Sequence, residues 1–148
     1  MKPLYPIITV FSLLMAGVLS SAHSAPIDDR ILANERAELQ KDHDSMESTD
    51  RDMRMEHQKW AKLNGGAADD ALMKRDEALL KKHSALIAKH AALIKEHAKL
   101  KVDSSGEKSD KRLAEDHVRT IKKERQIMFD HEGLMREHTK MRKERAGT

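Results

Sequence analysis

Histidine is the residue type in this sequence whose spacing suits a chemical role. The chain contains nine histidines and no cysteine, so a metal ion would have to be bound through imidazole and carboxylate rather than thiolate groups. His83, His90 and His97 recur at seven-residue intervals, and Asp76 stands one interval before them. Seven residues are about two turns of an α-helix, so these side chains share one helical face. Such a face offers the ligand types of divalent transition metals.

This histidine column lies in the middle of an apolar stripe. Two apolar columns flank it, each with a seven-residue repeat; they are Leu72, Leu79, Leu86, Leu93 and Leu100, with Met73, Leu80, Ile87 and Ile94 beside them. At about 100° per residue, a histidine four residues after a leucine projects between the two columns. In heptad notation the leucines occupy position d and the histidines position a.

Two further segments repeat the arrangement independently. In the segment that follows, position a holds His117, Glu124, His131 and His138. In the segment that precedes, position a holds Arg36, His43, Asp50 and His57. Every histidine except His23 therefore stands at one heptad position between apolar residues. Solvated histidines would not be restricted in this way.

Three long helices are the elements that must position these columns. Turn-forming and capping residues concentrate in two interior stretches, 64–69 and 102–109, and little else interrupts helix formation. We expect helices over about 28–63, 69–101 and 109–145. Because short connections make consecutive helices antiparallel neighbours, the predicted fold is all-α, an antiparallel up-down-up three-helix bundle of coiled-coil-like helices.

Pairing the helices through their turns groups the a positions into four layers. With turns centred between Gly66 and Ala67 and at Glu107, antiparallel pairing sets the levels. The layers are His57 with Asp76 and His138, Asp50 with His83 and His131, His43 with His90 and Glu124, and Arg36 with His97 and His117. Moving the second turn by half a heptad gives other layers, and both registers stay open. We prefer the first because every layer then holds two histidines.

Two imidazoles and a carboxylate at one level are a common ligand set for transition metals. The histidines and carboxylates of the four layers are the predicted metal ligands, with zinc or copper favoured and nickel, cobalt or iron as alternatives. Arg36 cannot ligate a metal and its charge opposes a bound cation. We therefore expect the layer of His97 and His117 to be the poorest of the four sites.

A hydrogen-bonded network is the alternative use of the same residues. Protonated histidines facing carboxylates would set the helix register or respond to pH in a structural or envelope-associated protein. An enzyme is not expected, because a closed seam between three helices leaves no cavity for a substrate.

Residues 1–24 have the pattern of a secretory signal peptide. Lys2 supplies positive charge before an apolar run at 7–19, and small residues permit cleavage after Ala22 or Ser24. The run is shorter than the roughly 20 residues that span a membrane. We expect a periplasmic or secreted protein with no stable membrane anchor after cleavage.

The remaining chain, 25–148, has the composition of one small helical domain. Of all residues, 36% are charged and 3% are aromatic, which favours long helices over a β-sandwich. The net charge is only +3, and basic residues alternate with acidic ones, which argues against nucleic acid as a partner. Metal ions are the expected partners. The apolar residues beside position d either pack the second helix against the third, as we prefer, or bind a homodimer partner or an envelope protein.

Overall fold

Three helices make up nearly all of the described chain. The computed structural model describes residues 27–63, 67–102 and 107–147. Its elements are α1 (Asp29–Leu63), α2 (Ala67–His97) and α3 (Glu107–Ala146), and the described residues include no strand. The all-α prediction is confirmed. The predicted signal peptide, 1–24, lies outside the described residues.

Local groups explain where α1 begins and where α2 ends. The Asp28 Oδ1 accepts a hydrogen bond from the Ile31 backbone N–H at 2.7 Å, as an N-cap residue does. α2 was expected to continue to about residue 101, but it ends at His97. The Leu100 N–H donates to the His97 carbonyl oxygen at 3.0 Å, and such a three-residue bond tightens and closes a helix end. His97 is thus the last helical residue of α2.

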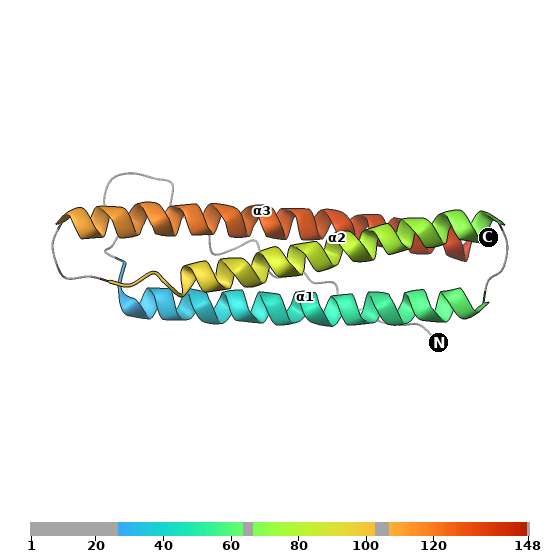
Figure 1. Cartoon of the computed structure of the whole chain (residues 1–148), viewed down its shortest axis with the longest axis horizontal. Helices are drawn as coiled ribbons and strands as arrows, with labels where there is room; N and C mark the ends of the chain where they lie inside the picture. Colours follow the sequence, from blue (N-terminus) through green and yellow to red (C-terminus); the bar gives the residue numbers. More distant parts are fainter. Residues whose placement is uncertain (1–26, 64–66, 103–106, 148) are drawn as a thin grey trace.

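The three helices lie side by side along the length of the molecule, and their chain directions alternate (Figure 1). α2 packs closely against both α1 and α3. Within the described ranges, no Cα atom of α1 lies within 8 Å of a Cα atom of α3. α1 and α3 meet through long side chains instead, for example between Glu56 and Arg142 at 3.3 Å. One side of the molecule is therefore more widely spaced than the others.

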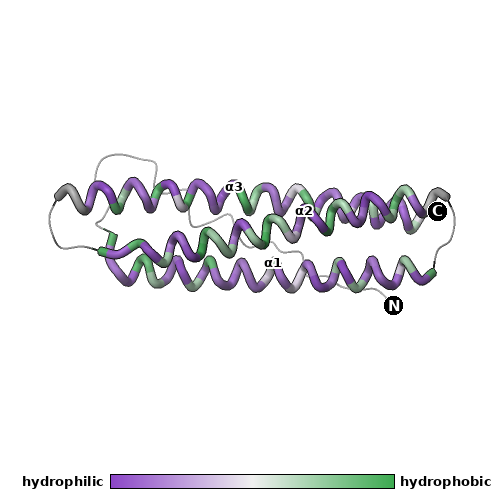
Figure 2. Tube along the Cα trace, viewed as in Figure 1, coloured by the Kyte–Doolittle hydropathy of each residue, from purple (hydrophilic) through white to green (hydrophobic). Residues whose placement is uncertain are grey.

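Residues at position d form the core. One buried cluster runs through all three helices; it contains Leu39, Met46, Met53, Leu79, Leu80, Leu86, Leu93, Ile127, Leu134 and Met141. Burying each such side chain contributes about 1.5–3 kcal/mol. Ile87, Ile94, Met128 and Met135 pack against this cluster, which gives the wide apolar stripes of α2 and α3 a packing role. Figure 2 shows hydrophobic residues recurring along each helix between hydrophilic ones.

A smaller apolar cluster lies at the end of the molecule where α2 ends. Leu32, Leu100 and Leu113 are buried together there, with Ile27 packed against them. Each of the two long helices that flank α2 contributes one of these leucines, so this end is closed by apolar contacts. As for longer apolar stretches, none of the described helices combines the length and the hydropathy needed to cross a membrane.

Candidate metal centre

Side chains from all three helices converge beside this smaller cluster. The Glu35 Oε2 atom lies 3.1 Å from the Nε2 atom of His97 and 2.6 Å from the Nε2 atom of His117. The two imidazole rings meet edge to face with centroids 6.1 Å apart. One ligand atom from each residue lies within 4.8 Å of the other two. Among the described residues, this is the one group of three such side chains in which every ligand atom lies that close to both others.

The three side chains of this group are largely shielded from solvent. The His97 side chain is 0% exposed, that of His117 15% and that of Glu35 22%. Zinc binds imidazole nitrogen at 2.0–2.1 Å and carboxylate oxygen at 2.0–2.2 Å, which places tetrahedral ligand atoms about 3.4 Å apart. The three atoms would therefore need to spread by less than about 1 Å to surround an ion. Without an ion, the carboxylate accepts hydrogen bonds from both imidazoles.

The position of Arg36 corrects the expectation that this layer would be the poorest site. Its Nη2 donates a hydrogen bond to the Leu100 carbonyl oxygen at 2.9 Å, where a guanidinium can satisfy an acceptor left free beyond the end of α2. Glu35, one residue earlier, supplies the carboxylate that the predicted layer lacked. Because the Arg36 side chain reaches the Leu100 carbonyl, Glu35 at the neighbouring position g can contact both imidazoles.

The layer of His57, Asp76 and His138 is also brought together, at the opposite end of the helices. The His57 Nδ1 lies 2.8 Å from the Asp76 Oδ2, and the His138 Nε2 lies 3.9 Å from the Asp76 Oδ1. Glu56 adds a second carboxylate, with Oε2 3.8 Å from the same His138 nitrogen. Burial lowers the pKa of His138, although the charges of Asp76 and Glu56 oppose that shift.

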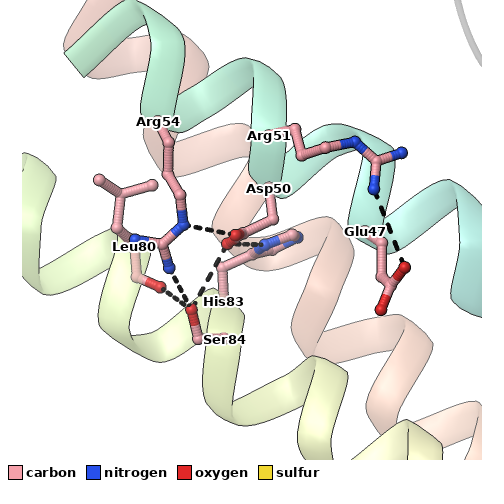
Figure 3. A network of polar contacts seen from close by, with 7 residues as sticks. All are labelled: Glu47, Asp50, Arg51, Arg54, Leu80, His83 and Ser84. Carbon is pink, nitrogen blue, oxygen red and sulfur yellow. Dashed lines mark hydrogen bonds and ion pairs between the residues drawn. The ribbon is translucent and has the colours of Figure 1, made fainter. Parts of the chain in front are cut away.

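In the layer of Asp50, His83 and His131, both carboxylate oxygens of Asp50 have hydrogen-bond partners. The Asp50 Oδ1 lies 3.1 Å from the His83 Nδ1, and Arg54 donates from Nε to the Asp50 Oδ2 at 2.6 Å. Arg54 also donates to Ser84 Oγ at 2.6 Å, as Figure 3 shows. Burial acts to raise the pKa of Asp50, but the hydrogen bonds from Arg54 and His83 lower it below the usual value.

His131 completes this layer only by ring contact. Its ring centroid lies 5.0 Å from that of His83. Burial, followed by the charges of His83 and His90, lowers the pKa of His131 to about 4. Its Nε2 and that of His83 are buried without a hydrogen-bond partner. The imidazoles are therefore close to each other but separate from any shared carboxylate.

The layer of His43, His90 and Glu124 is the least connected. The rings of His43 and His90 stack with centroids 5.6 Å apart, and both ring nitrogens of His90 are buried without a partner. The described contacts of these histidines do not include Glu124; His43 pairs with Glu47 at 3.5 Å instead. Burial, then the charges of Asp42 and Glu35, raises the pKa of Glu124 to about 7. The carboxylates of Asp42 and Glu35 are thus the main charges that act on Glu124.

The four layers differ in how many ligand atoms they focus on one point, and this is the property that binding a metal requires. Comparison with family models, curated proteins and solved structures finds no match to this chain. The interpretation of the site therefore depends on its own geometry. By that measure, of the four layers, the one with Glu35, His97 and His117 is best arranged to hold a metal ion.

The carboxylates that sequence reasoning missed belong to position g of α1. Glu35, Asp42 and Glu56 precede position a by one residue and keep its seven-residue spacing. Position g lies about 100° around the helix from position a, and Glu35 and Glu56 contact histidines of α3 from there. The spacing of these carboxylates is visible in the sequence. Position g of coiled-coil helices is usually charged, however, so the spacing did not single them out as ligands.

Proposed function

We propose that the chain is an exported, periplasmic metal-binding bundle of three antiparallel helices that sequesters, buffers or delivers a divalent transition metal. The observation that carries the proposal is the convergence of Glu35 Oε2 with the Nε2 atoms of His97 and His117, at 3.1 and 2.6 Å. Two imidazoles and one carboxylate suit zinc or copper best, with nickel, cobalt and iron next. Water or another ligand would complete the coordination sphere.

Buried histidines carry an energetic cost along the whole seam. Each buried polar atom without a partner costs about 1–3 kcal/mol, and the described seam contains several such atoms on imidazoles; they include His43 Nδ1, His83 Nε2, His90 Nδ1 and Nε2, His97 Nδ1 and His131 Nε2. Among these atoms only His97 Nδ1 belongs to a residue of the proposed site, and it is not one of the three converging ligand atoms. An ion there would replace the hydrogen bonds of Glu35 and would couple folding to metal binding. Binding rather than catalysis is the proposed role, because repeated histidine pairs along one seam suit binding capacity.

Export is proposed from the N-terminal sequence. Residues 1–24 combine a basic start, a short apolar run and small residues before the proposed cleavage sites. The absence of cysteine means that an oxidising compartment would not change the ligand set. A periplasmic protein with imidazole and carboxylate ligands would therefore bind metal without competing disulfide chemistry.

A pH-responsive or register-setting network is the second candidate function. The group of Asp50, His83, Arg54 and Ser84 favours it, because these side chains satisfy one another without a metal (Figure 3). Arg54 would also compete with a cation for the Asp50 carboxylate. On this alternative the other layers would also hold protons, and chelators would leave stability unchanged.

The test uses the full-length chain, expressed in a bacterial host and purified without a histidine tag. Metal content, zinc and copper titrations and thermal unfolding with and without chelator would be measured. Expected results are at least one tightly bound ion and stabilisation of about 2.7 kcal/mol when free metal is 100 times its Kd. N-terminal sequencing of the periplasmic fraction should give a chain that begins at His23 or Ala25.

Glu35→Gln is the decisive variant, with Glu38→Gln as its control on the same helix. Glutamine keeps the size of the side chain but removes the carboxylate charge, so Glu35→Gln should lose this ion. Glu38 is exposed and pairs only with Lys41 among the described residues, at 3.7 Å, so its variant should bind metal normally. A wild-type chain that binds no ion and melts identically with chelator would refute the proposal.

A further inference from the structure

The end of the helices opposite Glu35 carries a second group of unpaired ligand atoms. Asp76 Oδ1 and Glu56 Oε2 are both buried without a hydrogen-bond partner. They lie 3.9 and 3.8 Å from the same atom, His138 Nε2. The Asp76 side chain is only 1% exposed. Arg142 pairs with the other oxygen of Glu56, whereas a cation between these two buried oxygens would satisfy both of them directly.

The separations at this end fit an ion better than they fit hydrogen bonds. A hydrogen bond from imidazole to carboxylate requires about 2.7–3.2 Å, and both separations exceed that range. Ligand atoms around a tetrahedral zinc ion stand about 3.4 Å apart. The two separations from His138 Nε2 therefore exceed the spacing of a coordination sphere by only a few tenths of an ångström. The two carboxylate oxygens do not come within 4.8 Å of each other, so an ion between them would have to draw them together.

The remaining polar groups hold the carboxylates in place and leave one oxygen of each free. His57 Nδ1 lies 2.8 Å from Asp76 Oδ2, and Arg142 Nη2 lies 3.3 Å from Glu56 Oε1. Residues that hold the second atom of a ligand in this way orient it for a metal. His57 is therefore a positioning residue here, whereas the sequence had predicted it as a ligand.

We propose that Glu56, Asp76 and His138 form a second site for a divalent transition metal, so that the chain binds one ion near each end of its helices. This inference rests on the proposed function for the class of metal, but it uses other residues. Glu35 and Glu56 are 21 positions apart on α1, which is about 32 Å at 1.5 Å per residue. The two sites would bind independently at that distance.

Trp60 provides a local reporter for the second site. It is the only tryptophan of the chain, and it lies on α1 one helical turn after Glu56. A Cu²⁺ ion held by Glu56 would quench its fluorescence, whereas an ion held by Glu35 would be too distant. Chelator added afterwards should restore the fluorescence by removing copper, which binds nitrogen and oxygen ligands more tightly than zinc does.

The experiment titrates chelator-treated full-length protein with Cu²⁺, then removes the copper again with chelator, and records stoichiometry and Trp60 fluorescence together. We expect two ions per chain with quenching in the wild type. Glu56→Gln should lose one ion and most of the quenching, with its affinity for that ion at least tenfold weaker. Glu77→Gln, an exposed change beside Asp76, should behave as the wild type. His57→Gln should keep both ions but bind the quenching ion more weakly.

Glu35→Gln separates failure of this inference from failure of the proposed function. If this variant keeps the quenching ion and loses the other, both proposals hold. If Glu56→Gln alone removes an ion, the second site stands and the Glu35 centre fails. One ion per chain without quenching, lost in Glu35→Gln, would overturn the second site and leave the first. Absence of any tight ion would overturn both.

Discussion

Two layers of the seam contain the same kinds of residue but arrange their side chains differently. One is the layer of Glu35, His97 and His117 at its end, and the other is the layer of His43, His90 and Glu124 in its middle. At the end, Glu35 lies within hydrogen-bonding distance of both His97 and His117. In the middle, His43 and His90 stack on each other, and the pKa of Glu124 rises to about 7 because of its burial and the charges of Asp42 and Glu35. The side chain at position a is therefore not enough to make a site. A carboxylate from position g must reach between the imidazoles.

Replacing one buried histidine of α2 in each of these layers with leucine should give the largest difference between them. His90 and His97 are both 0% exposed, but only His97 has a carboxylate partner. His90→Leu removes two unpaired buried nitrogens and should stabilise the protein by about 1–3 kcal/mol. His97→Leu leaves one partner of Glu35 missing and should abolish the stabilisation that metal gives at this site, about 2.7 kcal/mol at 100 times Kd.

Denaturant unfolding with and without chelator would measure both effects. Leucine has a volume similar to that of histidine, so cavity formation contributes little to the difference. Equal loss of metal-dependent stability in both variants would show that the middle layer also ligates the ion. Destabilisation by His90→Leu would show that its nitrogens have partners in solution.

Glu124→Gln should remove a pH dependence from the middle layer. The folded pKa of Glu124 is about 7, raised from 4.5, so between these values the folded state binds a proton that the unfolded state has released. Stability from this group is therefore present at low pH and is lost as pH rises from about 4.5 to 7. The variant should be more stable than the wild type at pH 8 by about 1–2 kcal/mol, after allowance for partial exposure.

Unfolding free energies at pH 5 and pH 8, measured in the presence of chelator, would check this difference. His131 contributes a slope of the opposite sign, because its pKa falls to about 4 and the unfolded state binds more protons between about 4 and 6.5. Its contribution is present in both proteins and cancels in their comparison. An unchanged difference between the two pH values would contradict the assigned burial of Glu124.

Gly133→Ala should give the smallest effect and leave both layers intact. Gly133 lies inside α3, and a Cβ atom built there meets nothing within 4 Å. Alanine in a helix interior is more stable than glycine by about 0.5–1 kcal/mol. The melting temperature should rise slightly, with metal affinity and pH dependence unchanged. A change in metal affinity would show that helix stability alone controls binding, which would weaken the contrast between the layers.

The sequence predicted the helices well because their signals are local and repeated. Turn-forming residues and the seven-residue period locate three helices. The position-a residues that were predicted to share a level include two contacting pairs, His57 with Asp76 and Asp50 with His83. The period could not show which carboxylate would reach the imidazoles. Glu35 and Arg36 are adjacent, and only three-dimensional packing directs one toward His97 and the other toward the Leu100 carbonyl.

The early end of α2 was missed for a related reason. The apolar column continues to Leu100, so periodicity extends the helix beyond His97. The backbone instead turns, and the Arg36 side chain occupies the acceptor that this turn leaves. Contacts between residues 64 positions apart in sequence are not visible in a heptad pattern.

The wide spacing between α1 and α3 has a consequence for how fast ions would exchange. The carboxylates of Glu35 and Glu56 reach across this spacing and are 22% and 24% exposed, whereas the imidazole of His97 is fully enclosed. Rotamer changes of partly exposed side chains take picoseconds to nanoseconds, while separation of packed helices takes microseconds or longer. An ion at either proposed site could therefore enter and leave as one carboxylate swings outward, without separation of the packed helices.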